Sequence, residues 1–156
     1  MILKMKHNKE CIIDDEDWER ISNITWYVHY NQSNHYVFGW CKKTKKYLRL
    51  HRVILNAPEG KFVDHKNRNT LDNRKENLRL CNHQQNSYNR SKDYNNKSGY
   101  KGVSWSKQNK KWMAQITYSK TTYTLGFFKS KEDAALAYNK AVIKHHGEFA
   151  YVNKIE

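Results

Sequence analysis

The chain has 156 residues, a formal net charge of +14 and a sequence pI of about 9.7. This length allows one ordinary domain or two small ones, and the excess of Lys and Arg favours a polyanionic partner, most simply a nucleic acid. The sequence contains no run near the roughly 18 consecutive apolar residues of a membrane span, and its first residues have no long apolar core of the secretory type.

The three cysteines, Cys11, Cys41 and Cys81, are widely spaced and form no Cys-x-x-Cys pair. An odd number at this spacing predicts reduced thiols in the cytoplasm and argues against a disulfide framework or a four-ligand zinc site. Cys81 and His83 are close in sequence but lack a partner pair, so we interpret the cysteines as buried or incidental thiols.

Residues 1 to about 60 combine short runs of β-type residues with aromatic residues. Such runs at 26–28, 36–38 and 47–50 predict strands. The acidic patch at 14–17 interrupts this pattern, and we expect it to begin a short turn or helix.

Residues 61–90 are dense in Asn, Asp and Arg. The stretch 66–75 has little apolar content and predicts a loop, and a long loop inside a compact domain is usually functional or braced. Residues 78–80 alternate as a strand does, and Asn82 is placed to cap a following helix with Gln85 at the capping-box position. The predicted order is strand, loop, strand, helix.

Residues 91–98 are polar and aperiodic and predict a linker. The second unit, 99–156, contains three predicted strands, near 100–105, 112–118 and 121–128. A helix follows, capped by Ser130 and ended by Gly147, with an alanine-rich stripe suited to close packing on a sheet. The predicted fold class is therefore α+β.

The run Val63-Asp64-His65-Lys66 places an acid beside an imidazole in a very basic chain. Phosphodiester cleavage needs a positioned nucleophile, a base and charge stabilisation at the leaving oxygen. Carboxylate and amide oxygens are hard ligands that suit Mg²⁺ or Mn²⁺, and His is the side chain best poised to take a proton near neutral pH. Asp64 with an Asn could hold a divalent metal while His65 activates water.

The order and spacing of 63–66, 72–74, 76–79 and 85–86 resemble the HNH nuclease motif of phage and intron homing endonucleases. The match covers roughly 48–90 and includes the lead-in Leu50-His51-Arg52. The resemblance implies a ββα-metal core at about 48–90 within a nuclease domain at 1–90. It also implies roles for five residues: metal ligands at Asp64 and Asn86, a general base at His65, and bracing residues at Asn73 and Asn77.

Three points stay open for this motif. Neighbours on a regular strand point to opposite faces, so Asp64 and His65 can serve one metal only if the strand ends or distorts there. His51 could be structural, or could contact phosphate or metal. Several arginines are candidate phosphate contacts, although each could equally be a solvated charge: Arg52, Arg68, Arg74, Arg79 and Arg90.

The runs at 100–103, 111–116, 125–128 and 134–138 resemble the Apetala-type DNA-binding domain of plant ethylene-response factors. The resemblance implies a three-stranded antiparallel sheet packed on one helix, with the sheet in the DNA major groove, which is wide enough to admit it. Trp105 and Trp112 could stack on DNA, but we favour packing inside the domain. The implied DNA-facing residues are Lys101, Ser104, Lys111, Gln115, Thr117, Thr122 and Thr124.

Together these features predict a homing-type, metal-dependent endonuclease that cuts double-stranded DNA at a recognised site. The expected cofactor is Mg²⁺ or Mn²⁺, and the expected state is a cytoplasmic monomer in a bacterial host, with no membrane or protein partner and a phage or intron origin. Two alternatives remain: a DNA-binding regulator with an inactive HNH site, and a non-specific HNH nuclease.

Overall fold

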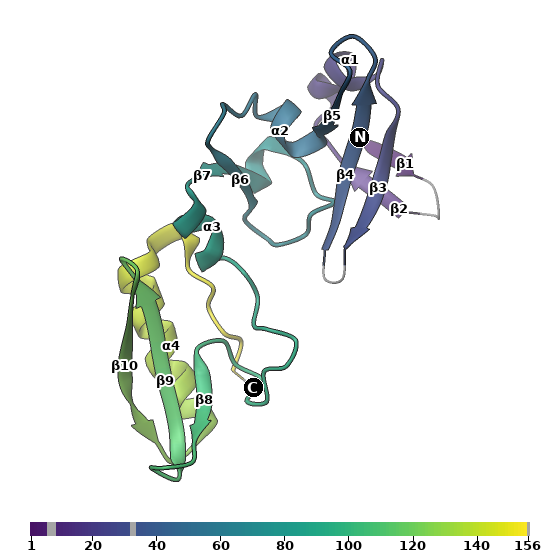
Figure 1. The fold of residues 1–156 in the computed structure, drawn as a ribbon. Helices are drawn as coiled ribbons and strands as arrows, with labels where there is room; N and C mark the ends of the chain where they lie inside the picture. Colours follow the sequence, from purple (N-terminus) through teal and green to yellow (C-terminus); the bar gives the residue numbers. More distant parts are fainter. Residues whose placement is uncertain (6–8, 32–33, 156) are drawn as a thin grey trace. The chain divides into compact units, whose positions relative to one another are not determined.

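The structure, a computed structural model, describes residues 1–5, 9–31 and 34–155 (Figure 1). The chain divides into two compact units, Met1–Asn86 and Ser87–Glu156. Both units combine small antiparallel sheets with few helices, which confirms the α+β class. The division lies inside helix α3 (His83–Tyr88), earlier than the predicted linker. Ser98, within that predicted linker, is buried and donates to the Val103 carbonyl at 2.8 Å, so this segment is packed into the second unit.

Among its described residues, the first unit contains three small sheets, the short helices α1 and α2, two 3-10 helices and the start of α3. The sheets are β1–β2, β3–β4–β5 and β6–β7, all with antiparallel neighbours. In chain order the elements are β1 (Ile2–Met5), β2 (Lys9–Ile12), the 3-10 helix η2 (Asp15–Asp17), α1 (Trp18–Ile21), β3 (Trp26–Asn31), β4 (Asn34–Cys41), β5 (Lys46–Arg49), α2 (Leu50–Ile54), β6 (Phe62–His65), the 3-10 helix η3 (Lys75–Asn77), β7 (Leu78–Cys81) and the start of α3.

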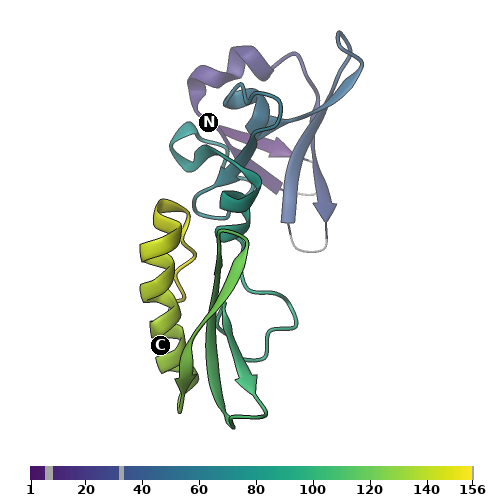
Figure 2. The ribbon, with the colours of Figure 1, turned by 60° about the vertical axis from the view of Figure 1, so that its left-hand side comes forward.

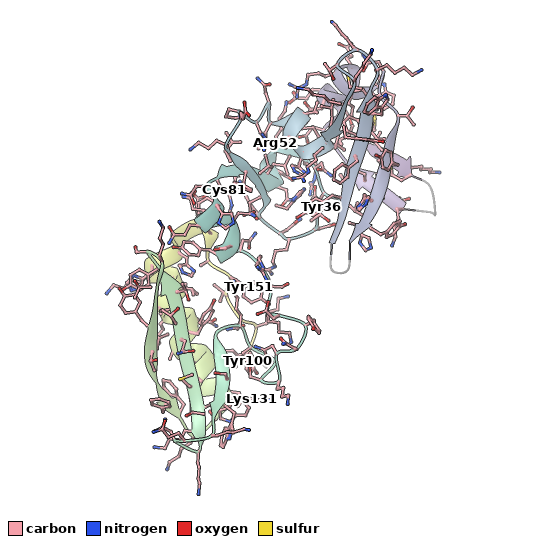
Figure 3. All side chains as sticks on the ribbon, in the orientation of Figure 1. Tyr36, Arg52, Cys81, Tyr100, Lys131 and Tyr151 are labelled. Atoms are coloured by element: carbon pink, nitrogen blue, oxygen red, sulfur yellow. The ribbon has the colours of Figure 1, made fainter. Side chains whose placement is uncertain are left out.

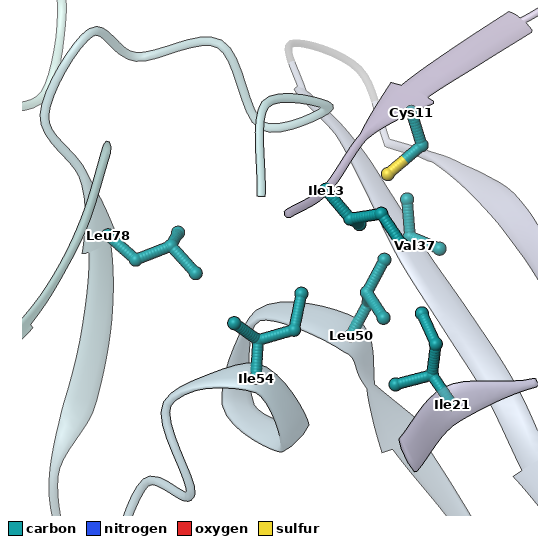
Figure 4. Close-up of a cluster of buried hydrophobic side chains, with 7 residues drawn as sticks. All are labelled: Cys11, Ile13, Ile21, Val37, Leu50, Ile54 and Leu78. Carbon is teal, nitrogen blue, oxygen red and sulfur yellow. The ribbon is translucent and has the colours of Figure 1, made fainter. Parts of the chain in front are cut away.

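One apolar core holds these elements together (Figure 4). Its seven buried members come from β2, α1, β4, α2 and β7 and from Ile13, just after β2. The sheet β3–β4–β5 contributes Val37, backed by Trp26 and Val28, because alternate strand residues face the same side. Because Leu78 of β7 and Val37 of β4 are both members, the core joins β7 to the sheet β3–β4–β5. Its members are Cys11, Ile13, Ile21, Val37, Leu50, Ile54 and Leu78.

The second unit contains the sheet β8–β9–β10 with helix α4 lying along it (Figures 1 and 2). Buried Ala114 and Ile116 of the sheet belong to the same two apolar clusters as Ala134, Ala135 and Val142 of the helix. Small helix residues allow this close approach. The bounds are β8 (Val103–Ser106), β9 (Lys111–Tyr118), β10 (Thr121–Phe128), α4 (Lys131–His146) and the 3-10 helix η4 (Gly147–Phe149).

The ends of α4 follow the predicted signals. The Ser130 hydroxyl accepts from the Asp133 backbone amide at 3.0 Å, and Gly147 stands after the last turn with φ 55°. The first strand differs from its prediction, because residues 100–102 form a turn. Gly102 has φ 75°, and a β-carbon there would lie 2.1 Å from the Tyr138 ring, so the chain turns where only glycine fits.

Within the described residues, no helix is long and apolar enough to cross a membrane.

Candidate active site

Asp64 and His65 are the last two residues of β6, and both are buried. In the pairing with β7, Asp64 stands opposite Arg79 and His65 opposite Leu78. The strand ends at His65, and the Lys66 amide donates to the Asn77 carbonyl at 2.8 Å. The two side chains therefore begin from adjacent positions at a strand end, where the loop to η3 starts.

Asp64 forms an ion pair with Arg79. Arg79 Nε donates to Asp64 Oδ2 at 2.8 Å, and Arg79 Nη2 lies 2.7 Å from the same oxygen. Only 9% of the Asp64 side chain and 10% of the Arg79 side chain are exposed. The carboxylate that the sequence marks as a metal ligand is therefore a cation-binding group in this structure, and its cation is a guanidinium.

The His65 ring is oriented by Asn73. His65 Nε2 lies 3.3 Å from Asn73 Oδ1. Asn73 Nδ2 in turn donates to the Thr70 carbonyl at 3.3 Å and to Cys11 Sγ at 3.2 Å. Because a carbonyl only accepts, the amide must present its oxygen to His65, so neutral His65 carries its proton on Nε2. Nδ1 is then the unprotonated nitrogen of the ring.

Two further rings pack around His65. His51 of α2 meets it edge-on at 5.2 Å between ring centroids, and Tyr36 of β4 lies 5.6 Å from His51 and 6.2 Å from His65 (Figure 3 labels Tyr36). This environment is buried and aromatic. His51 is therefore part of the packing around the His65 ring.

Burial sets the protonation of both histidines. It lowers the pKa of His65 below its usual 6.5, an effect that the Asn73 hydrogen bond and the carboxylates of Asp64 and Asp72 oppose. Burial, and then the charge of His65, lowers the pKa of His51 to about 3. Both rings are neutral at pH 7. A neutral, oriented imidazole can act as a general base.

The loop between Lys66 and Lys75 is braced from inside by amide side chains. Asn77 Oδ1 accepts from the Asn67 backbone amide at 2.9 Å, and Asn77 Nδ2 donates to the Asp72 carbonyl at 2.7 Å. The loop is also anchored to β2, because Ile12 donates to the Leu71 carbonyl and accepts from the Asn73 amide. These bonds hold the Asn73 side chain at His65.

Asn86 lies on α3, whose start is capped as predicted. The Asn82 amide donates to Gln85 Oε1 at 2.9 Å, and the Gln85 amide donates to Asn82 Oδ1 at 2.8 Å, which confirms the capping box. The distance from Cys81 Sγ to Asn86 Oδ1 is 4.0 Å. Burial raises the pKa of Cys81 to about 11, so at pH 7 it is a neutral thiol that can donate to this oxygen.

Most of the arginines predicted to contact phosphate have internal partners. Arg52 donates to the carbonyls of Ala57, Pro58 and Lys61 and so closes the turn after α2 (Figure 3). Arg74 forms two bonds of 2.9 Å to the Asp72 carboxylate. Arg79 pairs with Asp64, and Arg90 with Asp93 at 3.1 Å. The exposed Arg68 has φ 66°, in the left-handed region.

The residues expected to face DNA in the second unit divide into two groups. Lys101 is engaged inside the unit, since its Nζ donates to the Tyr88 and Arg90 carbonyls at 2.7 and 2.6 Å. The others lie on β8, β9 and β10, and Thr117 and Thr122 share a hydrogen bond of 2.8 Å. All of these are exposed except the half-buried Gln115: Ser104, Lys111, Gln115, Thr117, Thr122 and Thr124.

Sequence reasoning missed two members of this site. Tyr36 is about thirty residues from His65 in the sequence, and no local pattern marks it as a neighbour of the histidines. Asp72 is buried and accepts from Arg74 and from Asn67 Nδ2. The signal available in the sequence was its position in the motif segment 72–74, because an acid two residues before an arginine can pair with it.

Within the described residues, no group of three or more His, Cys, Asp or Glu side chains is placed to hold a metal ion. A site made from one carboxylate and one asparagine amide is a different kind of site, because it contains only one side chain of those four types. The side chains of Asp64 and Asn86 carry oxygen atoms of the hard kind that Mg²⁺ and Mn²⁺ prefer, and their contacts in the structure are with Arg79 and Cys81 respectively.

Comparisons with known proteins identify relatives of the chain. A family model described as HNH endonuclease matches residues 49–88. The "Uncharacterized HNH endonuclease L560" of Acanthamoeba polyphaga mimivirus is 30% identical over 143 residues, covering 90% of this chain and 73% of that protein. "Protein 3.8" of Escherichia phage T7 is 40% identical over 60 residues, covering 38% of this chain and 50% of that protein. No solved structure matches.

Proposed function

The chain belongs to the HNH endonuclease family and is a DNA-cleaving hydrolase, and from that premise we propose that it is a metal-dependent, homing-type endonuclease that cuts DNA at a recognised site. The observation that carries this proposal is the His65 ring, which is buried, neutral at pH 7 and oriented by Asn73 beside the Asp64 carboxylate.

In the proposed reaction, His65 Nδ1 takes a proton from a water molecule. The oxygen of that water attacks phosphorus, the bond from phosphorus to the 3′ oxygen breaks, and the leaving oxygen takes a proton from solvent. Asn73 Oδ1 accepts from Nε2–H, so the ring keeps its orientation while Nδ1 is protonated. Asn77 supports this indirectly, because it fixes the loop that carries Asn73.

Asp64 and Asn86 are the residues that would hold the divalent metal. When bound, such an ion stabilises the charge on the reacting phosphoryl group and the departing 3′ oxygen. Asp64 is already committed to a cation through Arg79, so metal binding must share or displace that ion pair. Arg79 is then available to a phosphate oxygen, in agreement with the contact that the sequence predicts.

We propose the second unit as the part that recognises the DNA site, by analogy with Apetala-type domains. Two observations support this role. The unit is a three-stranded antiparallel sheet packed on one helix. The face of β9 opposite the helix carries Gln115 and Thr117, polar groups that can meet base edges or phosphates. Lys101 is not part of this proposed face, because its ammonium group is bonded to backbone carbonyls.

The test is cleavage of a plasmid that carries the DNA flanking the gene for this chain, with Mg²⁺ or with EDTA. Wild type should cut at one locus only with metal, and His65→Ala should lose about 10²- to 10⁴-fold in rate while still binding DNA. Equal cleavage by His65→Ala would exclude His65 as the base. Binding without cleavage by wild type would favour a regulator, and cleavage throughout the plasmid would favour a non-specific nuclease.

A further inference from the structure

The face of sheet β3–β4–β5 opposite the core is lined with aromatic residues. Residues that are paired across neighbouring antiparallel strands have their side chains on the same face of the sheet. Val28 is paired with Val37, and both pack on the core, so this pair identifies the inner face. The residues one position away therefore face outward. We call this surface the outer aromatic face; its members are Tyr27, His29, Tyr36, Phe38, Trp40, Tyr47 and Arg49.

The rings of the outer aromatic face are ordered along β4. Tyr36, Phe38 and Trp40 stand at every second residue, so they form one row. Arg49 lies over the Phe38 ring at 5.5 Å, and Tyr47 meets Trp40 edge-on at 4.8 Å. Exposure increases along the row, since Tyr36 is half-buried whereas Trp40 is 41% exposed, and Tyr47, paired with Trp40 on β5, is 67% exposed.

One end of this row reaches the proposed catalytic base. Tyr36 is the member that packs against His51 and His65, at 5.6 and 6.2 Å between ring centroids. An extended ligand lying along the row would therefore run toward the His65 ring. The outer aromatic face is continuous with the active site inside the first unit.

The other end of the row meets a strongly basic turn. Between Glu19 and Glu59 the sequence contains no Asp or Glu. The same segment carries seven cationic side chains, four of them at the exposed turn between β4 and β5 and at the start of β5. The four exposed lysines at this turn favour an anionic partner for the surface. The seven are Arg20, Lys42, Lys43, Lys45, Lys46, Arg49 and Arg52.

We propose that the outer aromatic face binds an unpaired stretch of the DNA strand beside the cleaved phosphodiester. Bases would stack on Trp40 and Tyr47, and phosphates would pair with the lysine turn. A row of rings with flanking cations suits unstacked bases, because every base has a face that can stack. The outer face of β9 is different, since its Gln and Thr side chains suit the edges of paired bases. This proposal rests on the proposed nuclease function.

The test measures binding of the full chain to labelled strands of about 16 nucleotides by fluorescence anisotropy, in EDTA so that no cleavage occurs. One strand is oligothymidine, and the other has the same backbone without bases. Wild type should bind oligothymidine more tightly than the abasic strand. Trp40→Ala with Tyr47→Ala should weaken oligothymidine binding about tenfold or more and remove the preference for bases.

The matched control is Trp18→Ala, because Trp18 on α1 is also 41% exposed but lies beside the acidic segment Asp15–Asp17. It should bind both strands as wild type does. Trp40→Phe keeps a ring at this position and should retain the preference for bases. This variant tests whether the effect of Trp40→Ala comes from loss of the ring or from a folding defect. Lys42→Glu with Lys43→Glu should weaken binding of both strands by the same factor, since phosphates are common to them.

Three outcomes would overturn the proposal. The first is that wild type shows no preference for the strand with bases. The second is that the Trp40→Ala, Tyr47→Ala variant binds oligothymidine within about twofold of the Trp18→Ala control, and the third is that this variant loses affinity for both strands by the same factor. These outcomes are separate from failure of the nuclease function, which shows as no metal-dependent cleavage by wild type. Base stacking without cleavage would retain the surface and reject the nuclease mechanism.

Discussion

Asp64 and Arg79 face each other across the β6–β7 pair, and the guanidinium lies 2.7 Å from the carboxylate. Both side chains are about nine-tenths buried. Burying a charged group is costly unless a group of opposite charge lies beside it. The structure thus provides a cation for Asp64 from the protein itself, where the family resemblance expects a metal.

Arg79→Gln should therefore increase the dependence of the first unit on divalent metal. Without metal, we expect a loss of about 3 kcal/mol in the free energy of unfolding, because Asp64 is left buried without its partner. Mg²⁺ should raise the melting temperature of this variant more than that of wild type, since the ion replaces the guanidinium. Thermal unfolding followed by circular dichroism, with and without Mg²⁺, measures both effects.

The control for that variant is Arg90→Gln. Arg90 pairs with Asp93 at 3.1 Å, but both side chains are mostly exposed. An exposed pair contributes at most about 1 kcal/mol, and its loss should leave the response to Mg²⁺ unchanged. A shift by Mg²⁺ that is equal in wild type and Arg79→Gln would show that the metal does not bind at Asp64.

Substitution of Asn73 should move the pH profile of cleavage. The wild-type rate should rise with pH, and the midpoint of that rise should lie below pH 6.5, because burial lowers the pKa of His65 and the base must be neutral. In Asn73→Asp the added carboxylate should raise that pKa and shift the rise to higher pH. Asn73→Ala should shift it lower and reduce the plateau about 10- to 100-fold, since the ring is no longer held. Rates under single-turnover conditions from pH 5 to 8 would show these shifts, and identical profiles would contradict the assignment.

His51 should make the first unit sensitive to mild acid. Its pKa is lowered to about 3 in the folded chain, against 6.5 as the ordinary value. The unfolded chain therefore binds the extra proton below pH 6.5, and stability is lost as the pH falls from 6.5 toward 3. The loss approaches about 1.4 kcal/mol for each pH unit. His51→Phe keeps a ring against Tyr36 but has no titrating group. In this variant the midpoint of urea unfolding should change less between pH 4.5 and 6.5 than it does in wild type.

The sequence predicted the parts of this site that depend on neighbours along the chain. The alternation at 78–80 and the reciprocal bonds of Asn82 and Gln85 are local, and the structure has both. Contacts between distant residues were beyond such patterns. Asp14 Oδ2 accepts from the Lys75 amide, and the Cys11 thiol accepts from Asn73. These contacts join the N-terminal hairpin region to the motif loop, and only the folded chain shows them.

The arginines show the same limit in the electrostatics. A motif can specify a cation, but the cross-strand register decides whether that cation meets a phosphate or an internal carboxylate. Arg79 meets Asp64 because β7 pairs with β6 in this register. Arg52 meets carbonyls because the turn after α2 folds back on it. Tyr36 came into the site in the same way, through the placement of β4 beside α2.

Gly102 and Gly99 offer a matched test of packing in the second unit. Both have positive φ, 75° and 86°, so alanine is strained at each by about 1 kcal/mol. At Gly99 a β-carbon meets nothing within 4 Å, whereas at Gly102 it would lie 2.1 Å from the Tyr138 ring. Gly99→Ala should cost only the strain. Gly102→Ala should cost about 3 kcal/mol in unfolding free energy, because overpacking adds to it. Similar losses in the two variants, measured by urea unfolding, would show that Tyr138 moves away freely.

Substitutions of Lys101 and Lys111 should distinguish a lysine with a structural role from a lysine that contacts DNA. Lys101 Nζ is bonded to the Tyr88 and Arg90 carbonyls, whereas Lys111 is exposed at the start of β9. Lys101→Met should lower the stability of the second unit by about 1 to 3 kcal/mol, because the carbonyls lose their donor. It should leave the salt dependence of DNA binding unchanged.

Lys111→Met should do the reverse. Its stability should stay within about 0.5 kcal/mol of wild type, and the slope of log K against log salt should fall by about 0.9, the value for one lost phosphate contact. Binding isotherms at several salt concentrations measure that slope for both variants. A lower slope in Lys101→Met together with an unchanged slope in Lys111→Met would place the phosphate contact at Lys101, and the bonds at the end of α3 would then have to break on DNA.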